Sequence, residues 1–307
     1  MSRYSAPDTG AAMHEVEVQV RPATARDQGR IRALLDQSHR RYIGFGNEDL
    51  PALLQHPAHA FIVADANGAL WGLACAMVRT RPPAPGEAKE IVWGYLRGLA
   101  IINGWRAEVG VWALIEGLRQ RLRSWKANYL VAYVTQAWME ASLREVGLQA
   151  VEQIVTYERI YEATPPLRPF PQGRIRPAQA PDVSSLAALD TAAFSSLWRL
   201  ASGELIEMLV TSAHFMVAEQ EGRIVGYACS DVQHGVGQIY RLAVHPAHQG
   251  QGIGRLLLAD ALAYCQSVGA FTVTINTQQS NHASDHLYRR FGFRPVPPRV
   301  PVMLGDV

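Results

Sequence analysis

The chain of 307 residues contains little cysteine and little charge. Its three cysteines, Cys75, Cys229 and Cys265, are odd in number and widely spaced, which argues against a disulfide framework and favours a reducing compartment. Charged residues make up 18% of the chain, and 29 basic against 27 acidic residues leave a net charge of +2 without a basic tract. We therefore expect neither a nucleic acid nor an anionic membrane as a partner.

Long apolar runs are also missing. No stretch is long enough to cross a bilayer, and the segment Met1–Met13 lacks the apolar core of a signal peptide. We therefore expect a cytoplasmic protein. The hydrophobic content of 48% is sufficient for the cores of two domains in a chain of this length.

Glycine is concentrated at one place, between a predicted strand and a predicted helix. Residues 239–244 are mostly apolar and partly β-branched, as in a buried strand, and an apolar stripe with helical spacing runs from Ile253 to Val268. Gly269 stands where a helix commonly ends. The turn that opens a helix suits a phosphate group, because the first N–H groups lack acceptors and glycine permits close approach.

Two common phosphate-binding motifs are absent from this turn. A G-x-G-x-x-G pattern starting at Gly250 or Gly252 would end on Arg255 or Leu257, and no Gly-Lys-Ser/Thr sequence of a Walker A loop is present. The pattern that does fit is Q-x-x-G-x-G, from Gln249 to Gly254.

A second motif follows the predicted helix. Residues 271–277 alternate apolar and polar side chains, as in a half-buried strand. Asn281 then stands at a predicted helix start, Tyr288 follows in that helix, and Gly292-Phe293 closes it.

In this order and spacing, the two motifs resemble those of the GNAT superfamily of acyl-CoA-dependent N-acyltransferases, over residues 174–293. The resemblance implies that acetyl-CoA is the acyl donor and that a primary amine attacks it directly. It also implies the cofactor-binding residues: backbone N–H groups of Leu242, Ala243 and Val244 for the acetyl carbonyl and pantetheine, Gln249, Gly250, Gln251, Gly252, Ile253 and Gly254 for the pyrophosphate, and Asn281 for the pantetheine amides. A helix-capping role is the alternative for Asn281.

By the same resemblance, Tyr288 is the general acid that protonates the departing thiolate. The alternative is a core tyrosine beside Leu287 and Phe291. The general base stays open. In the similar ribosomal-protein alanine acetyltransferases a fifth-strand glutamate has this role, whereas the matching residue here is Asn276. The remaining candidates are a water relay, Glu219, Asp231, His234 and Tyr240.

No metal is expected. His282 and His286 are spaced to share one helix face, but no third ligand is evident, and a solvated face is the simpler interpretation.

The chain also repeats itself. Val20–Ala23 recurs as Ile175–Ala178, and Phe61–Asp65 recurs as Phe215–Glu219. We expect an α/β (α+β) fold of two tandem GNAT-like domains, each a mixed, mostly antiparallel twisted sheet flanked by helices. The predicted boundaries are a flexible tail at 1–14, a degenerate N-terminal domain at 15–163, a proline-rich linker at 164–173 and the acetyltransferase domain at 174–307.

The first copy lacks the glycine turn. Only one glycine remains near its helix start, while Glu108 and Trp112 add charge and bulk, and Leu143 stands opposite Tyr288. In the second copy only 14 residues follow Phe293, and four of them are proline. Whether its last hairpin is short or is completed by the first copy stays open.

The sequence does not choose the acceptor, which could be a small metabolite, an antibiotic-like amine or a peptide N-terminus, nor does it give the acyl-chain preference or the oligomeric state. One alternative is a mycothiol synthase, which is similarly tandem. Another is a non-catalytic acyl-CoA-binding regulatory protein, which the retained Tyr288 argues against and the missing glutamate argues for.

Overall fold

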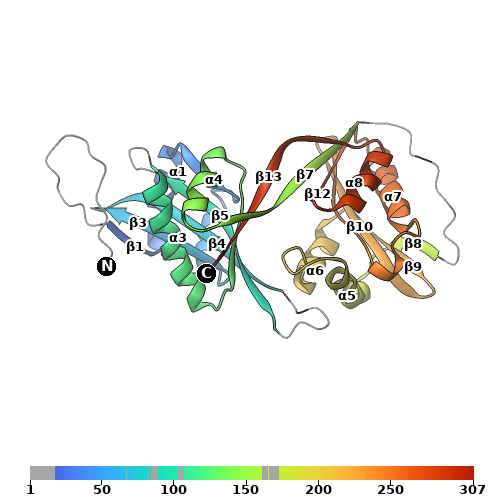
Figure 1. Cartoon of the computed structure of the whole chain (residues 1–307), viewed down its shortest axis with the longest axis horizontal. Coiled ribbons are helices and arrows are strands. Elements are labelled where there is room, and N and C mark those ends of the chain that lie inside the picture. The colour runs from blue at the N-terminus through green and yellow to red at the C-terminus, as the bar shows by residue number, and fades with distance from the viewer. Residues whose placement is uncertain are drawn as a thin grey trace. The chain divides into compact units, whose positions relative to one another are not determined.

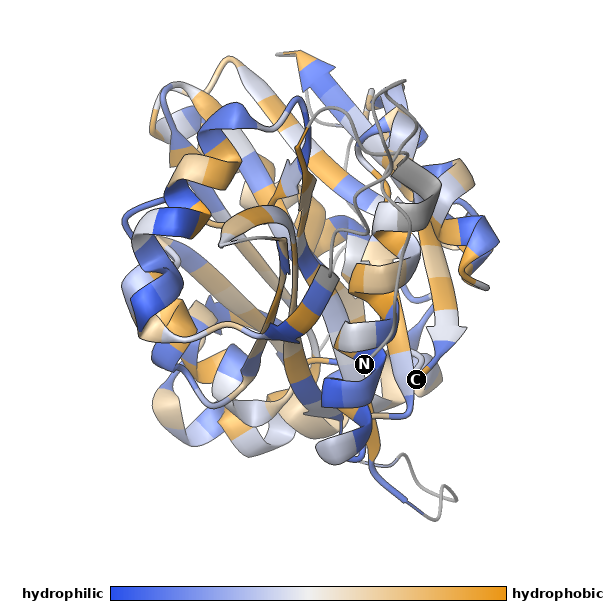
Figure 2. Ribbon diagram, turned by 90° about the vertical axis from the view of Figure 1, so that its left-hand side faces the viewer, coloured by the Kyte–Doolittle hydropathy of each residue, from blue (hydrophilic) through white to orange (hydrophobic). Residues whose placement is uncertain are grey.

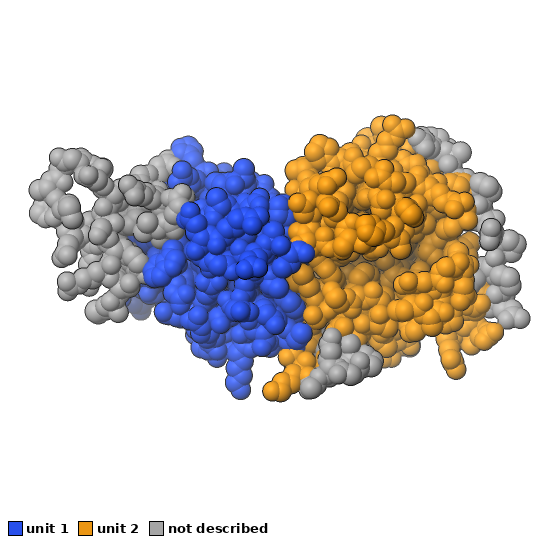
Figure 3. Space-filling view, viewed as in Figure 1, with its two compact units in different colours: residues 1–80, 91–151, 300–307 blue, residues 81–90, 152–299 orange. Residues whose placement is uncertain are grey.

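The computed structural model describes residues 18–66, 68–81, 83, 89–102, 107–160, 165 and 173–307, with only the backbone of residues 107–109. The chain forms two compact units (Figures 1 and 3). Unit 1 comprises Met1–Thr80, Ile91–Val151 and Val300–Val307, and unit 2 comprises Arg81–Glu90 and Glu152–Arg299. The expected tail at 1–14 and most of the expected linker at 164–173 lie outside the described residues.

Unit 1 is a mixed sheet flanked by helices. Its elements are β1 (Val18–Pro22), α1 (Gln28–Gln37), β2 (Arg40–Ile43), α2 (Leu50–Gln55), β3 (His59–Ala66), β4 (Ala69–Arg81), β5 (Ile91–Ile101), α3 (Ala107–Ser124), β6 (Tyr129–Tyr133) and α4 (Ala137–Glu145). The strand order is β1-β3-β4-β5-β6-β13, with β2 also paired to β5. Strands β5 and β6 pair in parallel.

Unit 2 repeats this plan. Its elements are β7 (Gln149–Ile160), β8 (Gly173–Pro177), α5 (Val183–Ala193), α6 (Ser202–Thr211), β9 (His214–Gln220), β10 (Arg223–Gln233), β11 (Val236–Val244), α7 (Ile253–Ser267), β12 (Thr272–Gln278), α8 (His282–Arg290) and β13 (Arg294–Asp306), which ends in unit 1. The order is β7-β12-β11-β10-β9-β8, with β11 and β12 parallel. The expected fold class is confirmed.

Each unit packs one long helix closely on its sheet. The apolar stripe of α7 includes Ile253, Leu257 and Ala261, all buried, whereas Val268 lies beyond the helix and is 52% exposed. A Cβ on Gly226 would come within 3.0 Å of Leu257, and a Cβ on Gly72 would come within 2.8 Å of Leu114 in α3. The two helices therefore approach equivalent glycines. Figure 2 shows apolar and polar residues alternating along the helices, as in amphipathic helices.

The first repeat of the sequence is residues 15–163 and the second is residues 174–307. The last strand of each unit's sheet comes from the other repeat. Residues 154–160 of β7, which follows the helices of the first repeat, pair with β12, and residues 302–306 at the end of the chain pair with β6. The prolines of β13 precede its β6-paired residues, so they remove no donor from that ladder. The second sheet is therefore completed by a strand of the first repeat, which answers the question that the sequence left open.

No helix in the described part of the chain combines the length and the apolar character needed to cross a membrane.

Candidate functional site

The parallel strands β11 and β12 part halfway along their length. They pair from Val236 to Ile239, after which β12 continues beside β7 and β11 continues beside β10. Tyr240 is an extra residue in β11, because Cys229 pairs with Arg241 while Ser230 pairs with Ile239. Such a bulge increases the local twist. Within the described residues, the β12-facing edge of Leu242–Val244 therefore has no strand partner.

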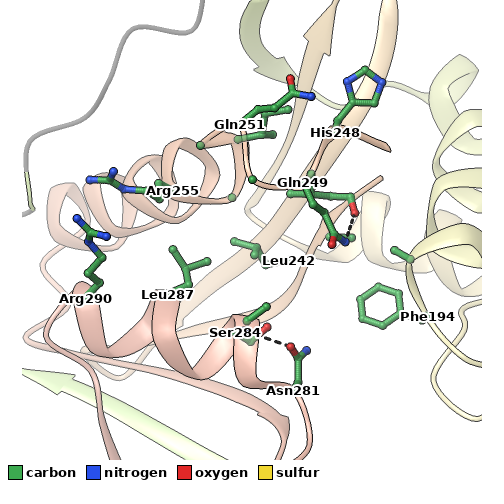
Figure 4. Close-up of a pocket in the computed structure, with 18 residues that line it drawn as sticks. Phe194, Leu242, His248, Gln249, Gln251, Arg255, Asn281, Ser284, Leu287 and Arg290 are labelled. Atoms are coloured by element: carbon green, nitrogen blue, oxygen red, sulfur yellow. Dashed lines mark hydrogen bonds between the residues drawn. The ribbon is translucent and has the colours of Figure 1, made fainter. Parts of the chain in front are cut away.

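The glycine turn lies directly after this edge. Gly250 has a φ of 76°, and Gly252, the N-cap of α7, has a φ of 89°, which L side chains rarely adopt. A Cβ at either position would meet no atom within 4 Å, so both glycines face open space. Gln249 ties the turn to the strand, because its Nε2 donates to the Val244 carbonyl at 3.1 Å (Figure 4). The first N–H groups of α7 have no acceptor within the helix.

A cavity of about 730 Å³ lies between β11, the glycine turn and α8. Its walls include every residue that the sequence indicated for cofactor binding: Leu242–Val244, Gln249–Gly254 and Asn281. The structure thus brings together residues from two separate motifs.

The charge of the cavity walls is positive. Arg255 from α7 and Arg290 from α8 lie on the same side of the cavity (Figure 4), and His248 also lines it. No aspartate or glutamate is among the described residues of its walls. With the N-terminus of α7, these groups favour a ligand that carries phosphates.

Several wall residues were missed in the sequence. Ser284, Leu287 and Arg290 repeat at helical spacing along α8, a signal that could have identified the wall once Asn281 was placed at the helix start. Phe194 follows α5 and carries no comparable local signal.

Asn281 caps α8. Its side-chain oxygen accepts the Ser284 N–H at 3.1 Å, so the capping interpretation is confirmed. Because Asn281 also lines the cavity, the cap positions its carboxamide at the wall (Figure 4).

Tyr288 lies in the core beside the cavity and is only 3% exposed. Its ring packs edge-on against Tyr157 of β7, at 5.6 Å between centroids, and the cavity wall does not include it. Burial raises the pKa of Tyr288 to about 12, against a hydrogen bond with Ser284 that lowers it. The phenol therefore stays protonated at neutral pH.

None of the general-base candidates lines the cavity. Glu219 accepts from Arg174 and Arg176 of β8 at 2.8 and 2.7 Å, and these hydrogen bonds, that of Arg176 first, lower the pKa of its carboxyl group. Asp231 lies on β10, and His234 lies in the turn between β10 and β11. Tyr240 is the bulge residue of β11 and is 43% exposed.

His282 and His286 are both exposed on α8. No group of three potential metal ligands occurs among the residues that the structure describes.

Comparison with known proteins places the cavity within a matched segment. The profile of the acetyltransferase (GNAT) family matches residues 183–293. A Bacillus subtilis (strain 168) protein assigned as a ribosomal protein bS18-alanine N-acetyltransferase is 28% identical over 123 residues, which are 39% of this chain and 80% of that protein. The mycothiol acetyltransferase of Streptomyces avermitilis is 34% identical over 83 residues, which are 26% of this chain and 27% of that protein.

A likeness in fold extends over nearly the whole chain. A tandem GNAT protein from the clavulanic acid biosynthesis pathway is 16% identical, with a TM-score of 0.63 over 94% of this chain and 98% of that one. At this identity the likeness concerns the fold alone.

Proposed function

Residues 183–293 belong to the acetyltransferase (GNAT) family, a family of acyltransferases, and we propose that this chain transfers the acetyl group of acetyl-CoA to a primary amine. We assign the activity to the second repeat, residues 174–307. The observation that carries the proposal is the glycine turn at the start of α7, which opens beside an edge of β11 that has no strand partner among the described residues.

The residues at this site fit acetyl-CoA. Gly250 and Gly252 leave room where side chains would otherwise stand, and the start of α7 with Arg255 and Arg290 provides positive charge for phosphates. The edge of β11 at Leu242–Val244 offers backbone groups to an extended, amide-containing arm.

Bound acetyl-CoA supplies a thioester: the acceptor nitrogen forms a bond to the acetyl carbon, the C–S bond breaks, the nitrogen loses a proton and the sulfur gains one. Backbone N–H groups of β11 near Leu242 stabilise negative charge on the acetyl oxygen, a contribution typically worth about 3 kcal/mol for one preorganised donor. Tyr288, on the helix α8 that forms one wall of the cavity, provides the proton for the sulfur. Solvent then returns a proton to Tyr288.

Among acceptors, a peptide N-terminus is supported by the similarity to an alanine N-acetyltransferase, which extends over 80% of that protein. A mycothiol synthase-like activity is the second candidate, supported by the similarity to mycothiol acetyltransferases, although that match spans about a quarter of the relative. Asn276, Asp231 and Tyr240 are not among the residues that line the cavity. A water relay is therefore the simplest route for the proton that the amine loses.

The test of cofactor binding is Gly252→Val. A β-branched side chain at a φ of 89° would fill the space in front of α7 and block its N–H groups. We expect acetyl-CoA affinity, measured by calorimetry, to fall at least about tenfold. Gly222→Val is the matched control, because Gly222 has a φ of 74° and open space around it, in the β9–β10 turn. Equal affinities in the two variants would contradict the assignment.

The test of catalysis is release of free CoA thiol with a panel of amines. Peptides that begin with alanine and small primary amines form its two arms, and mass spectrometry identifies the product. Binding of acetyl-CoA without thiol release in any arm would favour the non-catalytic alternative.

A further inference from the structure

We propose that Phe194 is the wall that limits the length of the acyl group, and that Arg241 and Asp190 are positioning residues that hold it. This inference rests on the proposed use of acyl-CoA by the second repeat. It adds a specificity determinant in a part of the site that none of the motifs covers.

The position of Phe194 distinguishes the two sides of the cavity. Phe194 and the neighbouring Ala193 line one side, and Figure 4 shows the ring across the cavity from Arg255 and Arg290. The arginine side suits phosphates, whereas the aromatic ring suits an aliphatic chain. The acyl group of the ligand therefore belongs on the side of Phe194.

The ring rests on Arg241. The guanidinium carbon of Arg241 lies 3.6 Å from the centroid of the Phe194 ring, a close cation–π contact. Arg241 directly precedes Leu242 on the bulged strand. One residue thus connects the apolar wall to the strand that presents the backbone groups of the site.

Hydrogen bonds to other residues hold the guanidinium group of Arg241. Its Nε and Nη2 donate to Asp190 Oδ2 at 2.9 and 2.6 Å, and Nη2 also donates to the Trp198 carbonyl at 2.8 Å. Asp190 is fully buried and also accepts the Tyr227 hydroxyl. A buried carboxylate needs such partners, and losing one would leave the others unsatisfied.

The backbone around Phe194 is fixed by the same network. The Phe194 N–H donates to the Asp190 carbonyl at 3.0 Å, and Arg199 Nε donates to the Phe194 carbonyl at 3.0 Å. The Leu200 N–H donates to Asp190 Oδ1 at 2.7 Å, which closes the loop that follows α5. A ring anchored from both its backbone and its face cannot easily move aside for a longer chain.

A fixed wall discriminates acyl groups by length. One methylene more or less in an apolar pocket typically changes recognition by about 10- to 200-fold. We therefore expect the protein to bind acetyl-CoA and to disfavour butyryl- and hexanoyl-CoA, in proportion to the space that the Phe194 ring occupies.

The experiment compares binding of acetyl-, butyryl- and hexanoyl-CoA to the full chain by calorimetry, with CoA thiol release as a second measurement. In Phe194→Ala, we expect the affinity for hexanoyl-CoA relative to acetyl-CoA to rise about tenfold or more, with Phe194→Leu intermediate. Phe271→Ala is the matched control, because Phe271 is 62% exposed and lies outside the cavity wall. The control should keep the wild-type ratio.

The positioning role is tested by Arg241→Lys, which keeps the charge but removes the flat guanidinium under the ring. We expect it to shift the same affinity ratio in the same direction, by less than Phe194→Ala does. An unchanged ratio in both Phe194 variants, with acetyl-CoA still bound, would overturn this inference while leaving the proposed function intact. Loss of acetyl-CoA binding by the wild-type chain would instead overturn the proposed function.

Discussion

The two repeats contain equivalent strands, β5 in unit 1 and β11 in unit 2, and these strands differ in what lies along one edge. In unit 1, β5 and β6 pair in parallel from Trp93 to Tyr95, just as β11 and β12 do from Val236 in unit 2. Continuing along both strands from these pairs, Leu99-Ala100 corresponds to Leu242-Ala243. Equivalent edges of β5 and β11 therefore lie in two different environments.

In unit 1 this edge is covered by the chain itself. Tyr42 of β2 pairs with Leu99, Arg41 with Ala100 and Arg40 with Ile101. The opposite edge of β5 is taken by β4, since the Ile102 N–H donates to the Trp71 carbonyl at 3.0 Å. Strand β2 therefore occupies the edge of β5 that corresponds to the open edge of β11.

The glycine turn differs as well. The glycine contacts align Leu114 of α3 with Leu257 of α7, and in this alignment α3 begins about one turn earlier than α7. The first helical residues of α3 therefore stand at the positions that correspond to Gly250 and Gly252. Glu108 lies there, although its side chain is not among those described, and Trp112 is 45% exposed.

This difference teaches that a fold can be kept while a site is lost. The core under α3 is intact, with Leu114, Leu118 and Leu122 fully buried. What changed is local: a strand covers the edge and a helical turn replaces the glycines. We therefore expect only unit 2 to bind acyl-CoA.

The largest effect is expected from separating the repeats in the chain. A fragment of residues 174–307 lacks β7, which pairs with β12 over seven residues from Thr272 to Gln278 and brings Tyr157 against Tyr288. It would expose a long unpaired strand edge, which promotes aggregation. We expect low soluble yield and no thiol release.

A fragment of residues 149–307 is the matched control, because it restores β7. It should be more soluble than the fragment 174–307. A fully active fragment 174–307 would show that the exchanged strand is dispensable.

The second effect concerns Tyr288, where the first repeat has Leu143. Tyr288→Phe keeps the ring contact with Tyr157 and removes the hydroxyl, so we expect kcat to fall roughly 100-fold, at nearly unchanged acetyl-CoA affinity. Because burial raises the pKa of Tyr288 to about 12, this group should cause no loss of rate between pH 7 and 10 in the wild-type protein.

Tyr264→Phe is the control for Tyr288→Phe. Tyr264 lies on α7 and stacks on His214 with 4.3 Å between ring centroids, outside the cavity wall. Its kcat should equal that of the wild type. A normal rate for Tyr288→Phe, when chemistry limits turnover, would mean that another group protonates the thiolate.

The parts of the site that the sequence predicted are those encoded locally. The turn from Gln249 to Gly254 and the start of α8 at Asn281 each consist of neighbouring residues, whose backbone conformations follow from glycine and from a capping side chain. The ion pair under Phe194 could not be predicted in this way, because Asp190 and Arg241 are 51 residues apart and neither belongs to a motif.

Strand partners were the least predictable part of the fold. The alternation of apolar residues indicates that a strand exists but not which strand it pairs with. The prolines of β13 also weakened the strand pattern near the C-terminus, although they precede the residues that pair with β6. Strand β2 has four residues, too few for a clear periodic pattern.

The smallest expected effect is the sharpest test of the comparison, because it is no effect at all. If β2 and the early start of α3 close the first repeat, the full chain should bind one acetyl-CoA in a calorimetric titration. Trp112→Ala, at an exposed position of α3, should leave both the stoichiometry and the affinity unchanged, whereas Gly252→Val weakens the single site.

Amide hydrogen exchange adds a local measurement: acetyl-CoA should protect residues 249–255 and should leave the protection of residues 98–101, already paired with β2, as it was. Two equivalent sites in the titration, or ligand-dependent protection at residues 98–101, would show that the first repeat has kept its site and that β2 moves aside to open it.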